Sequence, residues 1–89
     1  MESMTSDETL ALLRQENPKA RQDDLILYAD AFLAYQEAVG NIAKNGMVVA
    51  HPRTGAPIDN PYLRIREAAG KTLARLRRVR NIERLWSDR

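Results

Sequence analysis

The sequence of 89 residues contains no cysteine and a single histidine, and aromatic residues make up only 6% of it. Without cysteine the chain has no disulfide bond and no thiolate metal site, and one imidazole is too few for an ordinary zinc site. The scarcity of aromatic residues favours helices over a sheet sandwich. A chain this short buries only about 60% of its unfolded surface. Association with other subunits is therefore the expected source of additional stability.

Long hydrophobic runs are also missing from the sequence. No apolar segment approaches the ~20 residues that cross a bilayer, and the N-terminal residues are polar and acidic. We therefore expect a soluble, cytoplasmic protein that makes no contact with a membrane.

Charge is present in quantity, but it is unevenly distributed. Residues 1–45 contain eight acidic and four basic side chains, whereas residues 64–84 contain two acidic and eight basic ones, within a net charge of +2. Such asymmetry indicates either contact with nucleic acid or head-to-tail pairing between subunits. Composition alone does not choose between them.

The first segment, residues 1–22, is predicted to form a short helix and a connection. Thr5 and Glu8 fit a capping box, in which each side chain accepts a hydrogen bond from a free backbone amide at the helix start. Asn17 and Pro18 end the helix, because proline disfavours helical geometry in the residue before it.

A long helix is predicted over residues 23–44, followed by Gly46 as a residue with positive φ that closes it. Its apolar residues alternate by three and four positions, which is the spacing of one helical face: Leu25, Tyr28, Phe32, Tyr35, Val39 and Ile42.

A second long helix is predicted to begin at Asn60 and Pro61 and to run to about Val79. Asparagine caps free backbone amides, and proline is well suited to the first helical position. The apolar positions of this helix are Tyr62, Ile65, Ala69, Leu73, Leu76 and Val79. The intervening residues 47–59 fit either a short β-hairpin or a compact loop, with Pro52 and Pro57 at edge positions.

The resulting expectation is a mainly α fold, an antiparallel helical hairpin over residues 23–80 with a short β-hairpin or loop at its tip. Residues 1–22 precede this oligomerisation domain and a C-terminal tail, residues 81–89, follows it. Two amphipathic helices do not cover each other completely, so each leaves an apolar edge for another subunit.

The basic side chains of the second helix are the main candidate site. At about 100° per residue they fall in two rows that border its apolar stripe: Arg64, Lys71, Arg75 and Arg78 in one, and Arg66, Arg77 and Arg84 in the other. These rows fit a solvated surface, salt-dependent contact with DNA phosphates, or pairing with acidic residues of a neighbouring subunit. All three interpretations remain open at this point.

The first long helix supplies a candidate oligomer interface. Its acidic residues recur every seven positions on the side away from the apolar face, and two further apolar residues widen that face on one flank. These candidates are Asp23, Asp30, Glu37, Ile26 and Leu33. In the tail, Leu85 and Trp86 fit either an anchor for a partner or a segment folded back on the helices.

No arrangement typical of an enzyme is present. A phosphate-binding loop requires a glycine five residues before Gly70-Lys71, where Ile65 stands instead. His51 has no evident nucleophile or orienting carboxylate. We therefore expect no catalytic residues, no cofactor, no metal and no small-molecule substrate.

The junction between the long helices resembles that of the small terminase subunits of tailed phages and prophages. The shared pattern is a glycine, a hydrophobic strand, a P-x-x-G turn and an N-P-x-L-x-I helix start, formed here by Gly46, Val48, Val49, Pro52, Gly55, Asn60, Pro61, Leu63 and Ile65. The resemblance covers roughly residues 23–80.

This resemblance implies a non-catalytic, ring-forming homo-oligomer in a bacterial or infected host cell. It would bind double-stranded DNA, the large terminase subunit, or both, and regulate the ATPase and nuclease of that subunit. About 20 residues before the first long helix are too few for a helix-turn-helix, so DNA binding is expected to be non-specific, as in the shortened small subunits of gene transfer agents. The alternatives are a small dimeric DNA-binding regulator, of the phage repressor or antitoxin type, and a helical scaffold without nucleic acid.

Overall fold

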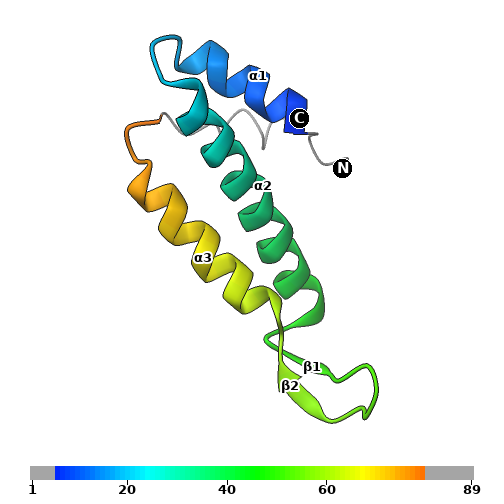
Figure 1. Cartoon of the computed structure of the whole chain (residues 1–89). Coiled ribbons are helices and arrows are strands. Elements are labelled where there is room, and N and C mark those ends of the chain that lie inside the picture. The colour runs from blue at the N-terminus through cyan, green and yellow to red at the C-terminus, as the bar shows by residue number, and fades with distance from the viewer. Residues whose placement is uncertain (1–5, 80–89) are drawn as a thin grey trace.

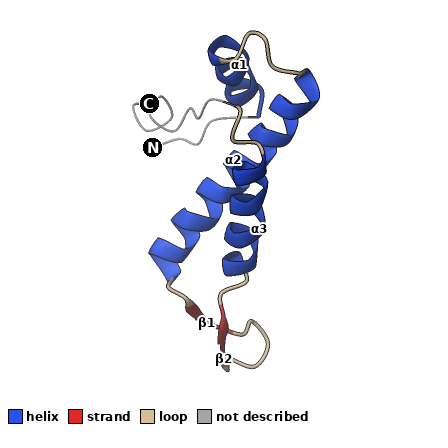
Figure 2. Ribbon diagram, turned by 90° about the vertical axis from the view of Figure 1, so that its left-hand side faces the viewer, coloured by secondary structure: helices blue, strands red, loops and turns tan. Residues whose placement is uncertain are grey.

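The computed structural model describes residues 6–79, which form three helices and one two-stranded sheet (Figures 1 and 2). The elements are α1 (Ser6–Glu16), α2 (Gln22–Asn45), β1 (Val48–Ala50), β2 (Pro57–Asp59) and α3 (Tyr62–Arg75). The predicted fold class is confirmed: α2 and α3 form an antiparallel hairpin, α1 precedes it, and the strands extend from its tip. None of the described helices combines the length and the apolar character that crossing a bilayer requires.

Helix α2 is the central element of the fold. Helix α1 packs against its N-terminal part and α3 runs beside its C-terminal part (Figure 1). The core lies where α1, α2 and the residues after α3 meet, and it consists of the buried side chains Leu13, Leu25, Tyr28, Ala29, Phe32 and Val79.

The face of α2 that meets α3 is built from small residues. Ala31 and Ala38 are buried on α2, as is Ala69 on α3, and a Cβ added to Gly70 would lie 3.6 Å from the Tyr35 ring. Small side chains let two helices approach closely. The predicted apolar face of α2 is therefore right for its first half but wrong at Val39, which is 37% exposed because the alanines make the closest contact instead.

Helix α3 ends earlier than the sequence predicted, at Arg75 rather than near Val79. Leu76 leaves helical geometry, with φ −97° and ψ 31°, and the amide of Val79 donates to the carbonyl of Leu76 at 2.9 Å. This turn brings Val79 into the core, where it is only 6% exposed. Burial of the apolar Val79 side chain favours this turn over continuation of α3 by further helical residues.

The segment between α2 and α3 is a β-hairpin and not an irregular loop. Strands β1 and β2 are antiparallel, with Val48 opposite Asp59, Val49 opposite Ile58 and Ala50 opposite Pro57. Gly46 before the hairpin has the predicted positive φ of 86°.

Candidate functional site

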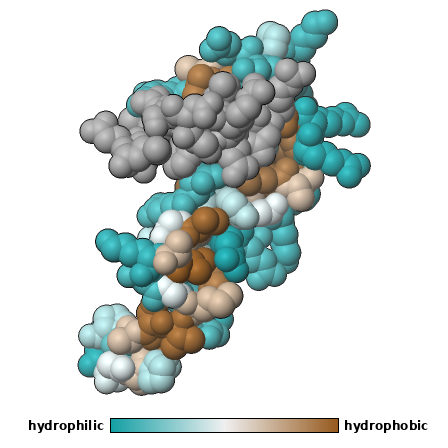
Figure 3. Space-filling model, turned by 180° about the vertical axis from the view of Figure 1, so that it is seen from behind, coloured by the Kyte–Doolittle hydropathy of each residue, from teal (hydrophilic) through white to brown (hydrophobic). Residues whose placement is uncertain are grey.

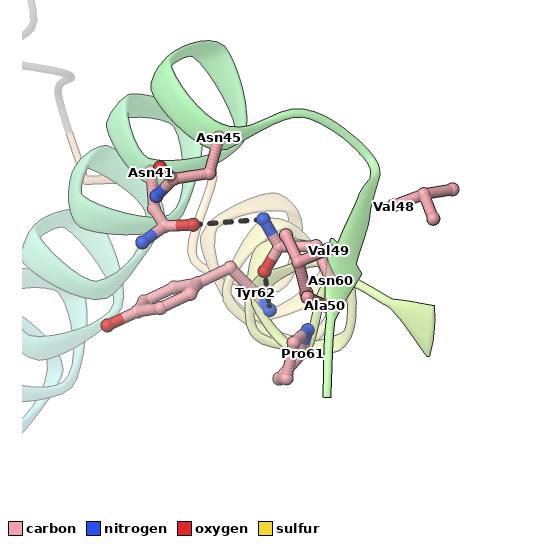
Figure 4. A pocket seen from close by; sticks show the side chains of 8 residues that line it. All are labelled: Asn41, Asn45, Val48, Val49, Ala50, Asn60, Pro61 and Tyr62. Atoms are coloured by element: carbon pink, nitrogen blue, oxygen red, sulfur yellow. Dashed lines mark hydrogen bonds between the residues drawn. The ribbon is translucent and has the colours of Figure 1, made fainter. Parts of the chain in front are cut away.

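The side chain of Asn60 holds the junction of α2, the hairpin and α3. Its Nδ2 donates to the Asn41 Oδ1 and to the Gly46 carbonyl, each at 2.9 Å, and its Oδ1 accepts from the Tyr62 amide at 3.0 Å (Figure 4). Only 2% of Asn60 is exposed. The predicted role of Asn60 as the cap of α3 is therefore confirmed, and the same side chain also fixes the end of α2.

Beside this junction lies an open hollow into which polar groups project (Figure 4). It is lined by Asn41, Asn45, Val48, Val49, Ala50, Asn60, Pro61 and Tyr62. At its edge the Tyr62 hydroxyl donates to the Glu37 carboxylate at 3.1 Å. This hydrogen bond, together with the negative charge of Glu37, raises the pKa of Tyr62 above its ordinary value.

Three residues of the first basic row are exposed on one side of α3. The side of α3 that carries Ala69 is buried against α2, whereas Arg64, Lys71 and Arg75 are exposed. Intervals of seven and four residues place these three within about 40° of one another around the helix axis. Arg78 is exposed as well, in the turn after α3. We name Arg64, Lys71 and Arg75 the basic face.

Two of these cations have neighbours within their own helix. Lys71 Nζ lies 3.3 Å from the Glu67 carboxylate in an exposed ion pair, and Arg75 Nη2 lies 3.4 Å from the Thr72 hydroxyl. Exposed pairs at this spacing contribute only about 0.3–0.5 kcal/mol. The basic face therefore remains available to another anion.

The second basic row is not assembled in the same way. Arg66 is half-buried in a hollow beside Tyr35 and Gly70, Arg77 is exposed beyond the end of α3, and Arg84 lies outside the described residues. Leu85 and Trp86 also lie outside the described residues. The structure thus brings together one of the two predicted rows.

The predicted acidic row is exposed along α2, but Asp30 and Glu37 lie towards α3 and not on the far side of the helix. Asp23 lies 3.9 Å from Arg21, Asp30 faces the gap between α2 and α3, and Glu37 accepts from Tyr62. Of the two apolar candidates, Ile26 is 42% exposed, whereas Leu33 packs partly against the core of its own subunit.

Sequence reasoning missed an apolar groove between α2 and α3. Its walls are Leu27, Ala31 and Ala34 on α2 and Ile65, Ala68, Ala69 and Thr72 on α3, with Asp30 at its edge. Leu27 is 54% exposed and Ile65 is 41% exposed. The spacing of Leu27, Ala31 and Ala34 is a helical one and was the available signal. Exposed apolar side chains gathered in one groove are typical of a contact surface.

The residues weighed above as possible phosphate-binding or catalytic groups lie within a helix and a turn. Gly70, Lys71 and Thr72 lie within α3, not in a loop after a strand. His51 Nδ1 accepts from the Arg53 amide at 3.1 Å, within the turn of the hairpin. Between residues 6 and 79 there is no group of three or more histidine and carboxylate side chains placed to hold a metal ion.

Comparison with known protein families assigns the chain to a family. The family profile of the phage terminase, small subunit, matches residues 7–78, which span all three helices and the hairpin. Neither the comparison with curated proteins nor that with solved structures gives a match. Small terminase subunits act in phage DNA packaging and are generally non-catalytic. Since the profile covers most of its length, the chain belongs to the phage terminase small-subunit family.

Proposed function

We propose that this chain is an oligomeric component of a DNA-packaging motor that holds duplex DNA by its phosphates and recruits or regulates the large terminase subunit. The observation that carries the DNA contact is the basic face, where Arg64, Lys71 and Arg75 are exposed on one side of a helix packed against α2. Arg64 and Arg75 are eleven positions apart, which corresponds to a rise of about 16.5 Å along the helix. Cations over such a length can reach several phosphates of one duplex.

Binding of this kind is expected to depend on salt and not on sequence. Lysine and arginine that neutralise phosphates release counterions, whereas base-edge contacts are what read sequence. The alternative of a repressor or antitoxin is not favoured by the family match.

The proposed homo-oligomer is supported by the groove between α2 and α3. Leu27 and Ile65 are both exposed there, and their burial by another subunit would remove apolar surface from water. Acidic Asp30 lies at the edge of this groove, while the basic face lies on the outside of α3. A head-to-tail arrangement places the acidic row of one copy against basic residues of the next and closes into a ring.

The DNA contact is tested by fluorescence anisotropy with a random-sequence duplex over a range of salt. The variant Arg64→Gln/Lys71→Gln/Arg75→Gln is compared with Lys19→Gln/Arg21→Gln/Arg53→Gln, which loses the same charge from exposed positions elsewhere. The first variant is expected to bind about tenfold to hundredfold more weakly, with a salt slope smaller by about 2.7 for three lost phosphate contacts. Equal weakening of both variants would refute a localised DNA surface.

The assembly is tested by native mass spectrometry of the purified protein across the same salt range. A single closed species of many copies, which loosens as salt rises, is the expected result. A monomer at every salt concentration would contradict the oligomeric part of the proposal.

A further inference from the structure

The hairpin at the tip exposes apolar side chains that no described element covers. Met47 is 58% exposed and Val48 is 59% exposed, more than any other large apolar side chain between residues 6 and 79. Viewed from behind, the lower part of the molecule shows apolar surface where the hairpin lies (Figure 3). A two-stranded hairpin on its own is marginally stable in water. The tip is therefore suited to a further strand.

The hydrogen-bond register shows which backbone groups are available for such a strand. The Asn60 amide donates to the Met47 carbonyl and the His51 amide donates to the Ala56 carbonyl, each at 2.8 Å. Bonded and non-bonded pairs alternate along an antiparallel ladder. Val48 and Ala50 lie between the bonded positions, so their backbone donors and acceptors point away from β2.

The two edges of this small sheet differ in their protection. On β2, Pro57 has no amide hydrogen to offer and Asp59 carries a charge, and both features discourage pairing with another strand. On β1, residues 48–50 are Val-Val-Ala and contain neither proline nor charge. Only the β1 edge is therefore open to strand addition.

We propose that β1 pairs with β1 of a second copy, in an antiparallel arrangement centred on Val49. Val48 of one copy then lies opposite Ala50 of the other, and four backbone hydrogen bonds join the outward-pointing groups of the two strands. The second copy is the occupant because pairing removes both unprotected edges at once. The four-stranded sheet that results ends on β2 at both sides, so a third copy finds only protected edges.

The β1 contact adds detail to the proposed oligomer. It rests on that proposal only because both require more than one copy of the chain. It is isologous, so it joins copies two by two, whereas the groove between α2 and α3 is a separate surface. The basic face has no residue in common with either surface, although Arg75 contacts Thr72 of the groove wall. Failure of one contact can therefore be distinguished from failure of the others.

Disulfide trapping tests the pairing directly, because the chain has no cysteine of its own. In the proposed sheet, Val49 faces Val49 of the other copy in a non-hydrogen-bonded pair, where Cα atoms lie about 4.5 Å apart, within the range of a disulfide. Under mild oxidation, Val49→Cys is expected to run mostly as a reducible dimer on a denaturing gel. The control is Ile58→Cys, its half-buried partner on the protected strand, which should remain monomeric.

A second variant weakens the contact by removing one backbone donor from each copy. Ala50→Pro deletes an outward-pointing amide and so two of the four hydrogen bonds of the pair, which should weaken pairing by on the order of tenfold or more in sedimentation equilibrium. The DNA affinity per subunit should not change. The triple variant of the basic face, in turn, should still allow Val49→Cys to cross-link.

Three outcomes would overturn the proposal. Cross-linking of Val49→Cys no greater than that of Ile58→Cys, with native circular dichroism, would exclude the β1 contact. Unchanged self-association of Ala50→Pro would do the same. If Ala50→Pro instead lost only its retention on immobilised large terminase subunit, the edge would serve a foreign strand and not a second copy.

Discussion

The side-chain nitrogen of Asn60 lies 2.9 Å from the side-chain oxygen of Asn41, and this hydrogen bond joins the start of α3 to the last turns of α2. The same nitrogen donates to the carbonyl of Gly46, where the chain leaves α2 for the hairpin. Three segments thus share one buried side chain. The orientation of the hairpin relative to the helices depends on it.

Replacement of Asn60 by alanine is expected to lower the free energy of unfolding by about 2–3 kcal/mol, because a capping hydrogen bond and two further part-buried hydrogen bonds are lost together. Urea unfolding followed by circular dichroism measures the effect at fixed protein concentration, since the proposed association would also contribute to stability. Asn45→Ala is the control, because Asn45 lines the same hollow but is exposed. A loss below 1 kcal/mol for Asn60→Ala would show that the junction is held by other contacts.

Two glycines of the same region should respond to alanine in opposite directions. Gly46 has φ 86°, so Gly46→Ala should destabilise the fold by about 1–2 kcal/mol. Gly40 lies within α2 with no atom near the added Cβ, so Gly40→Ala should stabilise it by about 0.5–1 kcal/mol. Thermal unfolding of both variants measures the difference. Shifts of the same sign would contradict the assigned backbone geometry.

Ionisation of Tyr62 should depend on Glu37. The hydrogen bond to the carboxylate and its charge favour the neutral phenol, so the pKa of Tyr62 lies above its ordinary value of 10.0. The stabilisation from this pair is present below pH 10.0 and is lost as the pH rises through the raised pKa. Glu37→Gln is expected to lower the pKa of Tyr62 towards 10.0 in a near-ultraviolet titration. Tyr62→Phe identifies which of the three tyrosine transitions moves.

The groove and the sequence-predicted interface can be separated with two isoleucines of equal exposure. Ile65 lies in the groove and is 41% exposed, while Ile26 lies outside it and is 42% exposed. Ile65→Ser should reduce the native mass of the assembly, because it places a hydroxyl in a contact that buries apolar surface. Ile26→Ser should leave the mass unchanged. The reverse result would favour the interface predicted from the acidic row and Ile26.

Periodicity and turn residues were enough to predict the helices, the hairpin position and the cap. The spacing of Leu25, Tyr28 and Phe32 marks a buried face because a helix repeats every 3.6 residues. Asn60 before Pro61 marks a helix start because each residue suits its position for local reasons. Such features depend on neighbours in the chain, so the sequence contains them directly.

Features that depend on how α2 and α3 approach each other were not predictable in this way. The exposure of Val39 follows from the close packing of alanines on facing helices, and the early end of α3 follows from the place that the core offers Val79. The Tyr62–Glu37 hydrogen bond joins residues 25 positions apart. The groove with Leu27 likewise exists only after the two helices have met.

The elongated shape of the chain has a consequence for how it can be used (Figure 1). The strand β1 is at one extremity, whereas the basic face is on the flank of α3 and the groove lies between α3 and α2. Surfaces that do not overlap need not compete for occupancy. If β1 pairs with a second copy and the basic face binds a duplex, as proposed, one copy can hold both at the same time, and DNA binding need not require the assembly to come apart.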